Sequence, residues 1–199
     1  SIRYLKEDLP RVKPIVMATV PRLWESIKIG FEDAVEKMPR LRKVLIKSAI
    51  SNSKAYKLAL RKFNFLTIDR VSMLDKIISL IEILFRFPIH RVSSIYLWPK
   101  ILTKICGGRL KFPISGGGAI AEHIDSFFEA LGVELLVGYG LTETSPVLTC
   151  RRPWRNIRGS AGQPLPETEI KIVDPDTFQI KKLRQKGLVL ARGPQIMSG

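Results

Sequence analysis

Two glycine-rich segments carry residue types that could bind a nucleotide. Each follows an apolar run typical of a buried strand, and the first leads into a stretch with helical spacing. We expect an α/β fold in which these two strand ends lie side by side, at the sheet edge where open α/β sheets bind nucleotides. The segments are Ser115-Gly116-Gly117-Gly118 and Gly138-Tyr139-Gly140-Leu141-Thr142-Glu143-Thr144.

The second segment combines three kinds of nucleotide contact. The ring of Tyr139 could stack on a base, the hydroxyl of Thr142 could bind a phosphate oxygen, and the carboxylate of Glu143 could hold Mg²⁺. A structural interpretation is equally open, in which Tyr139 packs in the core while Thr142 and Glu143 cap the next element. The glycine triplet by itself also fits a tight turn between strand and helix.

The spacing of Gly116, Gly118 and Ala121 also satisfies a loose dinucleotide fingerprint. That fingerprint requires an acidic residue at the end of the following strand, to hold the ribose hydroxyls. Gly138, Tyr139 and Gly140 stand there instead. The sequence therefore disfavours a dehydrogenase.

The pattern around these segments predicts a βαβ unit with a right-handed connection. Its expected parts are a strand over 110–115, an amphipathic helix over 121–131 and a buried strand over 133–137. A short strand over 15–20, followed by a helix that begins after Pro21, is expected near the start of the chain.

The remaining chain divides into a helical part and a β-rich part. Apolar spacing over 41–105 predicts several helices with lysine-rich outer faces, separated at Pro88 and Pro99. Period-two alternation predicts small antiparallel strands near 169–174 and 187–192. We expect one partial domain over 1–199: a basic, mainly helical part (1–109), the βαβ unit (110–146), and loops with short strands (147–199).

Composition excludes several classes of protein. The two cysteines and two histidines give neither a disulfide framework nor a metal-ligand spacing. No export signal is recognised, so a cytoplasmic location is expected. The longest apolar stretch, 71–87, contains four charged residues and is predicted to be an amphipathic helix rather than a membrane span.

The formal charge of +15 is concentrated in the first half of the chain. Residues 1–111 contain 23 Lys or Arg and 9 Asp or Glu. We expect Lys54, Lys57, Arg61 and Lys62 to form a docking face for an acidic carrier protein or for peripheral contact with an anionic membrane. No nucleic acid is expected as partner, because the region has no zinc-finger spacing, RNA-recognition motif or helix-turn-helix.

Residues 114–120 together with 137–146 resemble the adenylate-forming superfamily, the AMP-binding acyl ligases, in which the Tyr-Gly-x-Thr-Glu string is a specific signature. The likeness extends over nearly the whole chain. Residues 20–25 are similar to long-chain fatty acid members, and 159–166 to the loop that follows the Thr-Glu motif. Residues 151–154 and 187–190 most resemble acyl-acyl carrier protein synthetases.

The resemblance implies roles for the glycine-segment residues. Gly116, Gly117 and Gly118 would line the adenine pocket through their backbone. Gly138 and Gly140 would shape the pocket around Tyr139, which would stack on the base of ATP or AMP. Thr142 would contact the phosphate, and Glu143 would hold Mg²⁺. These residues are Gly116, Gly117, Gly118, Gly138, Tyr139, Gly140, Thr142 and Glu143.

The implied reaction activates a long-chain fatty acid to an acyl-adenylate and transfers it to the thiol of an acyl carrier protein or CoA. The family's phosphate loop is expected before residue 1, and its ribose-binding Asp, hinge and catalytic lysine after Gly199. We therefore expect an internal fragment that is inactive on its own. Glu167 stands where many members have glycine, and we expect the turn to tolerate it. The alternative is a noncatalytic basic module that binds an anionic membrane or nucleic acid.

Overall fold

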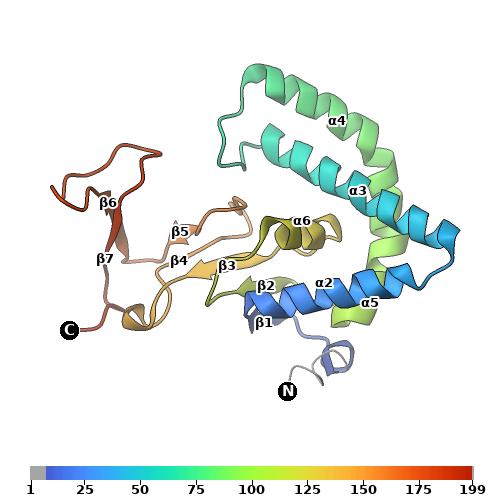
Figure 1. Cartoon of the computed structure of the whole chain (residues 1–199), viewed down its shortest axis with the longest axis horizontal. Coiled ribbons are helices and arrows are strands. Elements are labelled where there is room, and N and C mark those ends of the chain that lie inside the picture. Colours follow the sequence, from blue (N-terminus) through green and yellow to red (C-terminus); the bar gives the residue numbers. More distant parts are fainter. Residues whose placement is uncertain (1–7, 199) are drawn as a thin grey trace.

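Three parallel strands carry the two glycine segments in the computed structural model, which describes residues 8–198. Strand β1 (Val16–Thr19) pairs with β2 (Phe112–Ser115), and β2 pairs with β3 (Leu136–Tyr139). Two short antiparallel strands, β4 (Thr149–Cys150) and β5 (Gln163–Pro164), complete a five-stranded sheet in the order β1-β2-β3-β4-β5 (Figure 1). The fold is α/β, as the sequence predicts.

Helix α6 (Glu122–Ala130) connects β2 to β3 and confirms the predicted βαβ unit. It forms because its apolar residues recur at helical spacing, and they are buried. The predicted start of the following strand is wrong. Val133 and Leu135 are buried, but they precede the ladder, which begins at Leu136 and includes Tyr139. A continuous apolar run predicts burial, which these residues have, but it does not show where strand pairing begins.

Four α-helices lie between β1 and β2. They are α2 (Pro21–Glu36), α3 (Arg40–Phe63), α4 (Met73–Val92) and α5 (Trp98–Cys106). A π-helical turn, Ser93–Leu97, joins α4 to α5. The expectation that Pro88 separates two helices is wrong, since it lies inside α4, whereas Pro99 lies in the first turn of α5 as predicted. Helices α3 and α4 extend away from the sheet as a hairpin (Figure 1).

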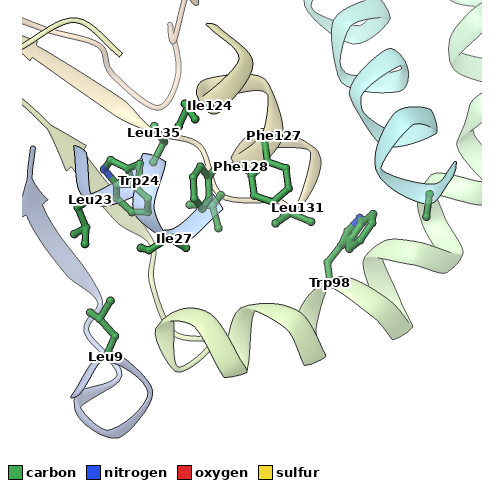
Figure 2. Packing of buried hydrophobic residues seen from close by; sticks show 12 residues of the cluster. Leu9, Leu23, Trp24, Ile27, Trp98, Ile124, Phe127, Phe128, Leu131 and Leu135 are labelled. Carbon is green, nitrogen blue, oxygen red and sulfur yellow. The ribbon is translucent and has the colours of Figure 1, made fainter. Parts of the chain in front are cut away.

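Aromatic side chains fix α2 and α6 against each other. The rings of Trp24 and Phe128 meet edge to face with centroids 4.9 Å apart, and Phe127 packs edge to face on Phe128 at 5.1 Å (Figure 2). The indole N–H of Trp24 donates to Thr19 Oγ1 at 2.8 Å, so the only polar atom of this ring is satisfied. The core therefore ties the start of α2 to the end of β1.

Helix α4 turns its apolar side chains outward. Only Ser79 is buried in this helix, and the exposed residues recur at three- and four-residue spacing. The predicted lysine-rich outer face is therefore wrong for α4. Among residues 8–198, no helix combines the length and hydropathy needed to cross a bilayer. The most exposed apolar residues of the helix are Met73, Leu74, Ile77, Ile78, Ile81, Leu84, Phe85 and Val92.

Strands β6 (Glu169–Val173) and β7 (Leu188–Arg192) form a separate antiparallel pair, which confirms the period-two prediction. They lie at the opposite end of the molecule from the α3–α4 hairpin (Figure 1). The turn before β6 places Glu167 at φ 60°, a conformation that favours glycine. The turn therefore accommodates Glu167 as expected, but with some strain in the backbone of this residue.

Buried ion pairs join α3, α6 and the loop after β4. Arg61 Nε donates to Glu129 Oε1 at 2.7 Å, and Arg158 pairs with the other oxygen of the same carboxylate. Arg151 pairs with Asp125 at 2.6 Å. Arg61, Glu129, Arg151 and Asp125 are each at most 5% exposed.

These contacts correct the predicted docking face. Arg61 is buried in the ion pair with Glu129. Lys57 lies 4.0 Å from Glu134, and Lys54 is half-buried over the ring of Phe127. Burial, and the nearby ammonium of Lys28, lower the pKa of Lys54. The four side chains therefore do not form one exposed basic surface. The prediction was wrong because sequence spacing alone does not show which side of α3 faces the protein.

The Glu129 carboxylate should be essential for stability. Replacing it in Glu129→Gln leaves buried Arg61 without its counter-charge and removes the nearest carboxylate from Arg158, and breaking such a buried pair costs about 3–5 kcal/mol. We expect this loss in urea unfolding of the full-length protein. Glu122→Gln is the matched control, since this carboxylate also faces Arg158 but at 4.0 Å and with 81% of its side chain exposed. Equal unfolding midpoints for the two variants would contradict the role of the buried pair.

Candidate functional site

A cavity of about 520 Å³ lies where the two glycine segments meet. It is formed by the turn after β2, the end of β3 and the loop after β4. Its size falls within the roughly 300–1,000 Å³ of small-molecule sites. The lining residues are Gly117, Gly118, Ala119, Ile120, Val137, Gly138, Tyr139, Gly140, Arg151, Gly159, Ser160 and Ala161.

Strand register brings the segments together. Ser115 lies opposite Val137 in the parallel β2–β3 ladder, so the next residues, Gly116 and Gly138, are neighbours. A Cβ on Gly116 would lie 3.8 Å from the carbonyl oxygen of Gly138. The N–H of Gly116 donates to the Thr19 carbonyl at 2.9 Å, and Gly116 is not among the lining residues.

Gly117 and Gly118 form the turn that faces the cavity. Gly117 has φ +76°, which a residue with a side chain rarely adopts. Cβ atoms at Gly117 and Gly118 would meet only Val20 and Pro21, at 3.9 and 3.6 Å. The backbone of this turn is therefore open on its cavity side and can approach a flat ligand closely.

Tyr139 is the last residue of β3 and is 38% exposed. Its carbonyl accepts the N–H of Leu148 at 2.9 Å, and it pairs with Thr149 in the antiparallel ladder. The strand thus fixes the backbone while the ring borders the cavity. The alternative in which Tyr139 packs in the core does not agree with this exposure.

The segment turns sharply after Tyr139. A Cβ at Gly140 would lie 1.8 Å from the Pro146 carbonyl oxygen, so only glycine fits there. Thr144 is buried, and its hydroxyl accepts the N–H of Leu141 at 2.8 Å and lies 3.1 Å from the Pro146 carbonyl. These contacts close the turn and leave the side chains of Thr142 and Glu143 exposed.

Thr142 and Glu143 lie in a 3-10 turn, Thr142–Thr144, beyond the residues that line the cavity. The Glu143 carbonyl accepts the N–H of Met197 at 2.9 Å, so the end of the described chain is attached to this turn. The described residues contain no cluster of three or more His, Cys, Asp or Glu that could hold a metal. A lone carboxylate suits Mg²⁺ that is bound mainly through substrate phosphates and water.

Arg151 is a site residue that sequence reasoning did not assign. It lines the cavity while its Nε donates to the Ser160 carbonyl at 2.8 Å and its Nη1 pairs with Asp125. These contacts fix the loop that carries Gly159, Ser160 and Ala161. The sequence offered no signal for this, because an arginine among three others in 151–158 resembles solvated surface.

Cys150, beside Arg151, faces Gly138 across the β3–β4 ladder. Partial burial raises the pKa of its thiol. The protonated thiol is the less nucleophilic form, and Cys150 is not among the residues that line the cavity.

The family model described as "AMP-binding enzyme" matches residues 2–199. From Arabidopsis thaliana, "Probable acyl-activating enzyme 16, chloroplastic" is 37% identical, and "Long-chain-fatty-acid--[acyl-carrier-protein] ligase AEE15, chloroplastic" is 38% identical. Each comparison covers 100% of this chain and 28% of the relative. "Long-chain-fatty-acid--CoA ligase 2" from Schizosaccharomyces pombe is 31% identical, over 100% of this chain and 26% of that protein.

A solved structure supports the fold. A long-chain-fatty-acid-CoA ligase from Archaeoglobus fulgidus superposes with a TM-score of 0.54 at 13% identity, over 100% of this chain and 28% of that one. The chain therefore spans little more than a quarter of the length of these proteins. The family match covers the cavity, both glycine segments and the helical hairpin, and the chain belongs to the AMP-binding enzyme family.

Proposed function

We propose that this chain forms the nucleotide-binding part of an ATP-dependent ligase that activates long-chain fatty acids. The observation that carries the proposal is the cavity shared by the glycine turn and the exposed ring of Tyr139. The relatives named as fatty acid ligases indicate the acyl substrate. The acceptor would be the thiol of an acyl carrier protein, with CoA as the second candidate.

Each site residue would contribute binding or charge stabilisation. The backbone at Gly117 and Gly118 would accommodate the adenine, and the ring of Tyr139 would stack on it. The Thr142 hydroxyl would donate to a phosphate oxygen, and the carboxylate of Glu143 would hold Mg²⁺, which neutralises phosphate charge when bound. Gly116 would act indirectly, by fixing the turn through its bond to Thr19.

Turnover by the full-length protein tests the proposal. We expect a long-chain fatty acid and ATP to give AMP, and an acyl thioester to form faster with phosphopantetheinylated carrier protein than with CoA. Glu143→Gln should lower turnover about a hundredfold, because charge at the phosphates loses its stabilising metal. Raising the Mg²⁺ concentration should restore part of the rate. Absence of AMP release with any fatty acid would exclude the ligase function.

Replacing the aromatic ring isolates the stacking contact. Tyr139→Ala should weaken AMP binding about 5- to 150-fold, the equivalent of about 1–3 kcal/mol of base–aromatic stacking. Tyr139→Phe keeps the ring and should bind AMP nearly as tightly as the wild-type protein. Calorimetric titration of the full-length protein with AMP measures both. Similar losses in the two variants would mean that the hydroxyl, and not stacking, makes the contact.

We also propose that the apolar face of α4 gives this protein peripheral contact with an anionic lipid surface. Leu74, Ile81 and Phe85 are 72%, 62% and 83% exposed, although they lie on one side of the helix. A helix with such a face can lie in the interface of a bilayer without crossing it. The net positive charge of residues 1–111 would strengthen binding to anionic headgroups.

Vesicle flotation tests this contact. Ile81→Glu combined with Phe85→Glu should weaken binding of the full-length protein to vesicles of phosphatidylcholine and phosphatidylglycerol by about tenfold or more. The reason is that two apolar side chains that would enter the bilayer interface are replaced by charged ones. Ile180→Glu combined with Leu183→Glu is the matched control, since these exposed apolar residues lie outside α4. Equal flotation of both double variants would refute the contact.

A further inference from the structure

A second cavity, of about 440 Å³, lies between α2 and α5. It shares no lining residue with the cavity at Tyr139. Leu9, at the edge of the hydrophobic cluster in Figure 2, and Ile27 belong to its wall. The full lining consists of Leu9, Ile27, Gly30, Phe31, Ala34, Met38, Lys100, Ile101, Lys104 and Ile105. We call this cavity the α2–α5 groove.

On its α2 side, the residues that line the α2–α5 groove follow one another along the axis of α2. Ile27, Phe31 and Ala34 recur at three- and four-residue intervals and so line one side of α2 over its second half, and Met38 continues this row just after the helix ends at Glu36. Gly30, on the same side, has no side chain to fill the space. The opposite wall is supplied by the isoleucines of α5. An apolar channel of this form matches a linear hydrocarbon chain better than a compact ligand.

Two ammonium groups border this apolar surface. Lys100 and Lys104 are four residues apart on α5, both are exposed, and both line the groove. Among residues 8–198, no carboxylate lines it. Within residues 8–198, no ion pair includes either lysine, while Glu32 and Glu36 of α2 are engaged by Lys28, Lys43 and Lys47. The groove therefore combines an apolar interior with positive charge that no carboxylate of residues 8–198 pairs with.

We propose that the α2–α5 groove is a second binding site for a free long-chain fatty acid. The hydrocarbon chain lies along α2 from Ile27 to Met38 in the bend after the helix, and the carboxylate lies between the ammonium groups of Lys100 and Lys104. Burial of methylene groups supplies most of the affinity, and the two lysines select an anionic head over a neutral one. The identity of the ligand as the acyl substrate rests on the proposed function, but the groove itself does not.

Equilibrium binding of radiolabelled palmitate to the full-length protein, without ATP, tests the site. Lys100→Glu combined with Lys104→Glu should weaken binding at one site at least tenfold, because attraction of the carboxylate becomes repulsion. Lys182→Glu combined with Lys186→Glu is the matched control, with the same charge change at exposed lysines far along the chain. It should leave palmitate binding unchanged. Equal binding by the two double variants would overturn the proposal.

A measurement without substitutions guards against misfolding of a variant. Palmitate that carries a diazirine near its methyl end should cross-link to peptides of α2 or α5 in the full-length protein. Labelling confined to other peptides would overturn the groove as a fatty acid site, as would the absence of saturable palmitate binding. The two proposals can fail separately. If the protein releases no AMP but palmitate still cross-links to α2 or α5, the ligase function is excluded and the groove assignment stands.

Discussion

The parallel pairing of β2 with β3 determines where the candidate site can form. Because Ser115 lies opposite Val137, the glycine turn and the Tyr139 segment must leave the sheet at the same edge. A shift of this register by one residue would turn the ring of Tyr139 to the other face of the sheet. The tight turn at Gly140, which admits no side chain, then returns the chain to β4. The loop after β4 forms the third wall of the cavity.

Buried charge connects this edge to the rest of the molecule. The carboxylates of Asp125 and Glu129 are on α6, one helical turn apart, and their arginine partners come from α3 and from the loop after β4. Arg151 belongs to both the charge cluster and the cavity wall. Desolvating these ions is expensive, so the arrangement persists only while every partner is present. It therefore fixes the position of one wall of the cavity at Tyr139.

Much of the fold was predictable because local periodicity and burial agree there. The βαβ unit and the β6–β7 pair follow from alternating and helical apolar patterns. Errors arose where tertiary contacts decide the outcome. The start of β3 depends on pairing with β2, Pro88 is accommodated within α4, and Arg61 is buried by Glu129 from a helix 68 positions away. The sequence predicts a role for Tyr139, which lines the cavity, but not for Arg151, which also lines it and whose position depends on Asp125 from α6.

Helix α2 physically links the two cavities. It begins against the glycine turn, where Pro21 lies within 3.6 Å of the position that a Cβ would take on Gly118. Its last three turns line the α2–α5 groove. Between these ends, Trp24 contacts Thr19 and Phe128, so the helix is anchored near the glycine turn. A ligand that separates α2 from α5 must therefore either leave that anchor in place or move the turn that borders the cavity at Tyr139, because close packing transmits the displacement of a helix to its neighbours.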